Sequence, residues 1–233
     1  YVITQFRVGW MDARREDEHL GRRHNLIGQE TTGIGGMANA LRTIPVVLKL
    51  AQDVEKFAEP GALLVNFTNP AGLVTQALAQ YAPRVASVGV CNAPIKMKMG
   101  FLKKLADDGL VIDPDEAKVD TLGLNHLTWF RGCTARGENL WPRILRLTID
   151  ALKKAERPEY PPALIESMQM IPNYYLVYFY DRLHHLAEQA KGKPSRAETV
   201  IEIEQTLFAE YAEPERNEAP QDLLKRGGAY YST

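Results

Sequence analysis

The sequence is poor in cysteine, in long apolar runs and in charge of one sign. Its 233 residues include only Cys91 and Cys133, which argues against a disulfide framework and predicts a protein of the reducing cytoplasm. The longest apolar runs, such as residues 62–65, are far too short to cross a bilayer. With 28 basic and 29 acidic residues, the net charge of −1 gives no reason to expect nucleic acid or a membrane as a partner.

What is present is an ordinary globular composition whose order of elements predicts an α/β fold. Apolar runs of β type alternate with segments whose apolar residues recur every three or four positions, which is typical of helices. The predicted strands cover residues 1–8, 62–67 and 85–91, and the helices cover residues 44–58, 71–81 and 95–106. This alternation indicates a parallel sheet with right-handed crossovers. The charged residues 12–18 are expected at the surface.

The pattern changes near residue 115, where we place a domain boundary. The segments that follow are strand-like or helical over residues 118–124, 127–133, 142–156 and 196–212. We therefore expect a first domain over residues 1–115 and an α+β domain over residues 116–233. Because the sequence begins within a predicted strand and ends directly after a glycine pair, we also expect it to be a piece of a longer protein.

Polar side chains stand where three apolar runs stop. Asn69 follows the strand over residues 62–67, Cys91 ends the strand over residues 85–91, and His126 follows Leu124. Ligands of open α/β sheets bind outside the carboxyl ends of the strands. We expect an amide, a thiol and an imidazole around one crevice.

Each of these residues also has a simpler interpretation. Cys91 alone could be a metal ligand, a nucleophile or a small buried apolar residue, and His126 alone could be structural. Together a thiolate and an imidazole suit a divalent metal, and two protein ligands leave positions open for catalysis. Asn66 and Asn69 could bind the hydroxyl groups of a sugar or cofactor, or could simply form a turn before Pro70.

Further candidates lie elsewhere in the chain. Arg7 ends the first predicted strand and could clamp a phosphate or carboxylate, and Glu30 could support such a site. Tyr230 and Tyr231 follow a basic, glycine-containing run, and a desolvated phenol can act as a base, although packing is the alternative. Residues 33–38 fit a dinucleotide-binding glycine pattern, but no strand precedes them, which favours a glycine loop that opens a helix.

Six segments in order resemble glycoside hydrolase family 4, in particular its members that act on 6-phospho-β-glucosides. These segments are residues 4–9, 27–31, 66–72, 89–95, 123–126 and 226–232. The resemblance covers essentially the whole chain, but the family's opening strand, its glycine-rich pyrophosphate loop and its C-terminal portion are absent. It implies an incomplete Rossmann-like parallel sheet of the lactate/malate dehydrogenase type over residues 1–115, followed by an α+β catalytic domain.

The resemblance implies hydrolysis by redox and elimination steps, an exception to the usual two-carboxylate mechanism. NAD⁺ accepts hydride from C3 of the sugar, a divalent metal such as Mn²⁺ acts as a Lewis acid, and a tyrosinate removes the C2 proton. The implied site residues are Cys91 and His126 for the metal, Tyr231 or else Tyr230 as base, Arg7 for the 6-phosphate, Asn69 for the sugar and nicotinamide, and Asn66 and Glu30 on the cofactor side. Asn92 has no titratable proton, which favours β-glycosides.

The expected partners are a phosphorylated disaccharide or aryl β-glucoside, and further copies of the chain in a dimer or tetramer. One alternative is an NAD-dependent 2-hydroxy acid dehydrogenase of the lactate/malate type, since His126 follows Asn69–Pro70 at a comparable spacing. Such an enzyme needs no metal and leaves Cys91 without a function. The other alternative is an inactive truncated fragment.

Overall fold

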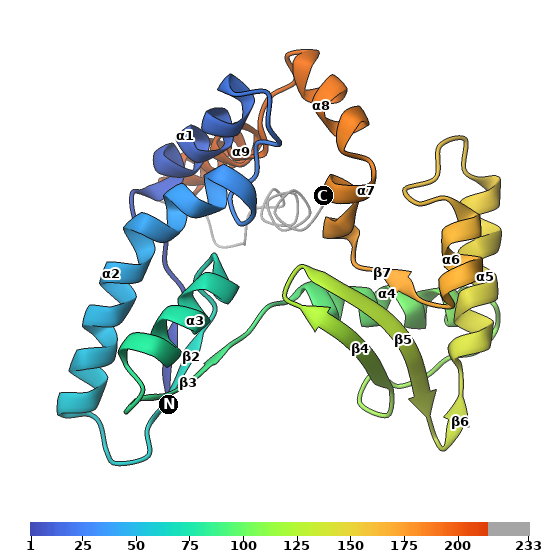
Figure 1. Cartoon of the computed structure of the whole chain (residues 1–233), viewed down its shortest axis with the longest axis horizontal. Helices are drawn as coiled ribbons and strands as arrows, with labels where there is room; N and C mark the ends of the chain where they lie inside the picture. Colours follow the sequence, from blue (N-terminus) through green and yellow to red (C-terminus); the bar gives the residue numbers. More distant parts are fainter. Residues whose placement is uncertain (214–233) are drawn as a thin grey trace. The chain divides into compact units, whose positions relative to one another are not determined.

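The computed structural model describes residues 1–213, which Figure 1 shows as helices and strands. Its contacts divide the chain into two compact units. Within the described residues, unit 1 comprises residues 1–90 and 183–213, and unit 2 comprises Cys91–Arg182. Among residues 1–213, no helix combines the length and the apolar character that a membrane span requires.

Unit 1 contains a parallel three-stranded sheet. Its strands are β1 (Val2–Thr4), β2 (Leu63–Asn66) and β3 (Ala86–Gly89), in the order β1-β2-β3. The helices that belong to it are α1 (Trp10–Arg23), α2 (Gly33–Phe57), α3 (Ala71–Tyr81), most of α8 (Arg182–Ala190) and α9 (Arg196–Tyr211). Helix α1 packs against α2 and α9, and α2 packs against α3. The parallel pairing confirms the predicted α/β class.

The core of unit 1 is apolar and lies between the sheet and its helices. Val47 and Ala51 of α2, Leu64 of β2, and Val74 and Leu78 of α3 are buried together. Burial of this apolar surface stabilises the crossovers that bring the carboxyl ends of β1, β2 and β3 to one edge of the sheet.

Helix α2 begins eleven residues earlier than the predicted helix over residues 44–58. The glycine motif opens this helix and follows a loop, as the alternative interpretation expects. A Cβ atom on Gly35 would lie 2.3 Å from the carbonyl oxygen of Gln29, so glycine permits the helix to contact that loop. Pro45 lies on the exposed face of α2, where water can hydrogen-bond the helical carbonyl that lacks an N–H partner.

Unit 2 contains an antiparallel sheet with helices on its apolar face. The strands are β4 (Lys118–Leu124), β5 (Leu127–Ala135), β6 (Glu138–Asn139) and β7 (Ile171–Pro172), and β5 pairs with each of the others. The helices are α4 (Ala93–Asp107), α5 (Trp141–Lys154), α6 (Pro162–Met168), the 3₁₀ turn η1 (Tyr174–Leu176) and α7 (Val177–Tyr180).

Aromatic rings join the helices of unit 2 to its sheet. Phe101 of α4 meets Phe130 of β5 and Trp141 of α5 edge to face, with centroids 5.4 and 5.8 Å away. The change from parallel to antiparallel pairing falls between residues 89 and 118. The compact units separate at residue 90 instead, and the domain boundary near residue 115 stays a prediction.

The expectation that residues 12–18 lie at the surface is wrong for three of them. Arg14, Asp17 and Glu18 of α1 are buried, because each forms an ion pair inside unit 1. Arg14 pairs with Glu18, and Arg42 of α2 pairs with Asp17. Buried charges are tolerated when they are paired in this way.

Candidate functional site

The structure brings Cys91 and His126 together in unit 2. The Sγ atom of Cys91 lies 3.6 Å from Nε2 of His126. Cys91 lies two residues before α4, and its sulfur accepts the backbone N–H of Ala93 at 3.4 Å. His126 closes the two-residue turn between β4 and β5 with a left-handed φ of 63°. For a non-glycine residue this conformation costs about 1–2 kcal/mol, and it is often found at functional sites.

These two side chains fit a shared metal ion. Bond lengths typical of zinc, about 2.3 Å to sulfur and about 2.0 Å to nitrogen, place two tetrahedral ligands about 3.5 Å apart. The observed Sγ–Nε2 separation of 3.6 Å agrees with that value. Burial raises the pKa of the Cys91 thiol, and the N–H groups of Ala93 and Asn92 oppose this effect. Metal binding at this pair would therefore displace a proton from the sulfur.

Other protein ligands do not complete the pair. Among residues 1–213, no three side chains of histidine, cysteine, aspartate or glutamate gather where they could hold a metal. A two-ligand arrangement leaves coordination positions for substrate oxygens or water, which a catalytic metal requires and a structural zinc site does not.

Tyr175 is a neighbour of this pair that the sequence analysis missed. Its ring stacks on the His126 imidazole with centroids 3.8 Å apart and planes 13° from parallel. Tyr174 contacts Tyr175 and carries the Lys96 ammonium group 4.9 Å from its ring centroid. The only sequence signal is the concentration of tyrosines over residues 174–180, whose spacing does not show which one meets the histidine.

Asn92 lies beside the pair, at the start of α4. Its backbone carbonyl accepts the N–H of Lys96 at 2.9 Å, and its Oδ1 atom is 3.9 Å from the Cys91 sulfur. An amide can donate or accept hydrogen bonds but cannot serve as an acid, and the substrate-binding role of Asn92 stays a prediction. Tyr230 and Tyr231 lie outside the described residues.

In unit 1 the Asn66 side chain is committed to the end of the sheet. It is fully buried, its Oδ1 accepts the Thr4 hydroxyl at 2.9 Å, and its Nδ2 donates to the Thr68 carbonyl at 3.0 Å. These contacts favour the turn interpretation, and a direct contact between Asn66 and a cofactor stays a prediction. The peptide bond from Asn69 to Pro70 is cis, and the binding role of the Asn69 amide stays a prediction.

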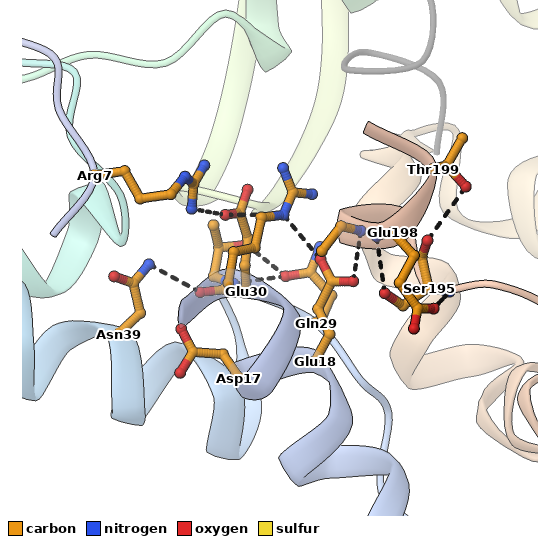
Figure 2. A network of polar contacts seen from close by, with 12 residues as sticks. Arg7, Asp17, Glu18, Gln29, Glu30, Asn39, Ser195, Glu198 and Thr199 are labelled. Atoms are coloured by element: carbon orange, nitrogen blue, oxygen red, sulfur yellow. Dashed lines mark hydrogen bonds and ion pairs between the residues drawn. The ribbon is translucent and has the colours of Figure 1, made fainter. Parts of the chain in front are cut away.

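Arg7 and Glu30 form an ion pair in unit 1 that the sequence did not predict. Figure 2 shows the Arg7 guanidinium pointing at the Glu30 carboxylate. The same carboxylate oxygen lies 3.3 Å from Nε of Arg14, which in turn donates to Glu18 at 2.9 Å. The Asn39 side chain holds the loop through the Glu30 carbonyl at 3.3 Å. Arg7 is thereby fixed beside the carboxyl end of β1.

The network of ion pairs continues to helix α9. The second carboxylate oxygen of Glu18 accepts the backbone N–H of Ala197, at the start of α9, at 2.9 Å. Ser195 caps this helix, since its hydroxyl accepts the N–H of Glu198 and the Glu198 carboxylate accepts the N–H of Ser195 (Figure 2). Helix α9 is thus tied to α1 and, through Arg14 and Glu30, to Arg7.

The predicted residues therefore form two groups. Cys91, Asn92 and His126 meet in unit 2, whereas Arg7, Glu30, Asn66 and Asn69 belong to unit 1. The single crevice that we predict around Asn69, Cys91 and His126 stays a prediction.

Comparison with known proteins identifies relatives along the whole chain. Residues 1–107 match the sequence profile described as family 4 glycosyl hydrolase, and residues 121–233 match that of its C-terminal domain. A probable 6-phospho-beta-glucosidase of Bacillus subtilis is 39% identical over 100% of this chain and 53% of its own length. A 6-phospho-beta-glucosidase of Escherichia coli is 37% identical over 100% of this chain and 52% of its own length.

Solved structures agree with these matches. A 6-phospho-beta glucosidase from Thermotoga maritima, solved with manganese, NAD⁺ and glucose-6-phosphate, superposes with a TM-score of 0.84 at 32% identity over 99% of this chain and 53% of that chain. A 6-phospho-alpha-glucosidase from gut microorganisms, in complex with NAD and Mn²⁺, superposes with a TM-score of 0.76 at 26% identity. The match covers 97% of this chain and 55% of that chain. The chain spans about half the length of these relatives.

Proposed function

The chain belongs to glycosyl hydrolase family 4, and from that premise we propose that it acts as a 6-phospho-β-glucosidase dependent on NAD⁺ and Mn²⁺. The proposed substrates are phosphorylated cellobiose and aryl 6-phospho-β-glucosides. One observation carries the proposal: Cys91 and His126 stand 3.6 Å apart as two ligands of the kind a catalytic metal needs. A hydroxy acid dehydrogenase would have no use for this pair.

In the proposed site Cys91 and His126 hold the metal. When bound, the metal supplies Lewis acidity toward sugar oxygens, and NAD⁺ supplies reversible hydride transfer at C3. The described residues offer no strand followed by a glycine loop for the cofactor's pyrophosphate, because the glycines of residues 33–36 follow a loop. The involvement of NAD⁺ is therefore supported by the relatives.

We assign the base to Tyr175 in place of Tyr231. A base that removes the C2 proton must lie beside the metal pair, and Tyr175 stacks on the His126 ring. In this proposal the Oη atom of Tyr175 receives the proton. The role predicted for Tyr231 stays a prediction.

Two residues of unit 1 are proposed for the substrate and cofactor. Arg7, held by Glu30, would bind the 6-phosphate through a guanidinium whose direction is already fixed. Asn69 would hydrogen-bond sugar hydroxyls or the nicotinamide. Asn92 cannot protonate a leaving group, which supports β- over α-glycosides. The homo-oligomeric state and the cytoplasmic location stay predictions.

The test measures release of p-nitrophenol from p-nitrophenyl-β-glucoside 6-phosphate and from its α-anomer, with and without Mn²⁺ and NAD⁺. We expect turnover of the β-anomer that requires both additions. Cys91→Ser should abolish the response to Mn²⁺. Tyr175→Phe should lower kcat by about 100-fold or more, in the range of general base catalysis, while Tyr231→Phe should retain most of the activity.

Other results would overturn parts of this proposal. Hydrolysis without either addition would refute the redox and elimination mechanism. Preference for the α-anomer would refute the role of Asn92. Loss of activity in Tyr231→Phe but not in Tyr175→Phe would return the base to Tyr231. Formation of NADH from a 2-hydroxy acid, without hydrolysis, would favour the dehydrogenase.

A further inference from the structure

Asn173 is a buried amide that joins two segments of unit 2. It is 1% exposed and lies between β7 and η1. Its backbone N–H donates to the Thr128 carbonyl at 2.8 Å, and its Nδ2 donates to the Thr128 hydroxyl at 3.1 Å. Its Oδ1 accepts the backbone N–H of Tyr175 at 3.1 Å, and its carbonyl accepts the Tyr160 hydroxyl at 2.8 Å.

The two segments that Asn173 joins carry the stacked rings of the candidate site. Thr128 is two residues beyond His126, and Tyr175 is two residues beyond Asn173. The Asn173 side chain therefore hydrogen-bonds Tyr175 itself and Thr128, which lies two residues from His126. The rings of Tyr175 and His126 stack with centroids 3.8 Å apart. A shift of this amide would move one ring relative to the other.

We propose that Asn173 is a positioning residue that sets the stacking of Tyr175 on His126. The proposal rests on the function proposed above for these two side chains. A buried amide that both donates and accepts a hydrogen bond favours one geometry, because displacement would leave an unpaired polar group. Apolar packing of η1 against β5 alone would leave the ring separation less defined.

The test uses substitutions at both ends of the amide contact. Asn173→Ala removes both side-chain hydrogen bonds, Thr128→Val removes one, and Thr128→Ser retains it. The control is Thr148→Val, the same chemical change in α5 of unit 2, at a buried hydroxyl that has no hydrogen-bond partner within the described residues. Thr128→Val also keeps the test valid if Asn173→Ala fails to fold.

Two measurements separate positioning from simple stability. The first is the ring-current shift of the His126 ring protons by NMR, assigned with His126→Gln, which reports the stack without metal, cofactor or turnover. The second is kcat and KM for p-nitrophenyl-β-glucoside 6-phosphate below the unfolding temperature. Misplacement of a catalytic group by about 1 Å can cost on the order of 100-fold in rate.

We expect Thr128→Val to reduce the His126 shift and to lower kcat about 3- to 10-fold with little change in KM, and Asn173→Ala to lower kcat about 10- to 100-fold. Thr128→Ser and Thr148→Val should match the parent protein. The proposal is overturned if Asn173→Ala and Thr128→Val lose stability but keep the His126 shift and kcat. If the parent hydrolyses no 6-phosphoglycoside while the shift still responds to Thr128→Val, the proposed function fails and the positioning role stands.

Discussion

Replacing Arg14 by methionine is expected to destabilise unit 1 by about 3 kcal/mol, because it removes a buried cation that contacts two carboxylates. The Arg14 side chain is 4% exposed, and its Nε atom lies 2.9 Å from Glu18 and 3.3 Å from Glu30. Breaking a buried pair typically costs about 3–5 kcal/mol. We expect the lower end of this range because both carboxylates retain a partner. Glu18 still accepts the N–H of Ala197, and Glu30 still pairs with Arg7.

The effect is measurable as urea unfolding followed by helical circular dichroism, or as a decrease in melting temperature of about 6–12 °C for a chain of this size. Arg15→Met is the matched control in the same helix. Arg15 is 38% exposed and pairs with an exposed Asp12 at 3.2 Å, so its loss should cost less than about 0.5 kcal/mol.

A double variant tests the cause of the loss. In Arg14→Met combined with Glu18→Gln, one uncompensated carboxylate is removed, while the amide oxygen can still accept the N–H of Ala197. This variant should recover about 1 kcal/mol or more of the stability lost in Arg14→Met, since the free-energy effects of substitutions within one network are not additive. A loss below about 1 kcal/mol for Arg14→Met, or equal losses for Arg14→Met and Arg15→Met, would refute the role of the buried network.

Three further predictions concern pH and packing. The hydrogen bond from the Ser195 N–H lowers the pKa of the Glu198 carboxyl. The ionised carboxylate therefore stabilises the folded state above about pH 4.3, and this contribution is lost as the pH falls. Glu198→Gln should flatten the decrease in unfolding free energy at acidic pH. Burial raises the pKa of Tyr160, so stability should fall as the pH rises above about 10, and Tyr160→Phe should flatten that limb. Gly35→Ala should destabilise by about 1–3 kcal/mol in urea unfolding, whereas Gly72→Ala, with open space around the new methyl group, should stabilise by about 0.5 kcal/mol.

Local pattern was sufficient for much of the fold. The helix predicted over residues 71–81 is found over those residues, since its apolar positions face one core and Pro70 stands immediately before it. The strands predicted over residues 118–124 and 127–133 occur as β4 and most of β5. The start of α2 was missed because glycine has low helix propensity, and the close packing of Gly35 on a loop backbone is a tertiary contact.

The candidate site was predictable in its chemistry and only partly in its geometry. Cys91 and His126 are 35 residues apart, yet each lies within two residues of a strand end, which made their meeting foreseeable. Tyr175 lies in η1, which follows β7, and the pairing of β7 with β5 is short and carries no local sequence signal. The Glu18 contact with Ala197 joins positions 179 residues apart, and charge pattern alone made α1 look exposed.

In both units a buried polar group fixes the position of a side chain that we propose for the functional site. In unit 1 Arg14 joins Glu30, and hence Arg7, to α9, and in unit 2 Asn173 joins the segment of Tyr175 to that of His126. Apolar packing could stabilise these contacts at least as well, since buried ion pairs are often replaceable without loss of stability. Apolar contacts lack direction, however, whereas a hydrogen bond is made only within a narrow range of distance and angle. Substitutions in these polar groups should therefore reduce activity in variants that remain folded, and apolar core substitutions should act mainly through the fraction of folded protein.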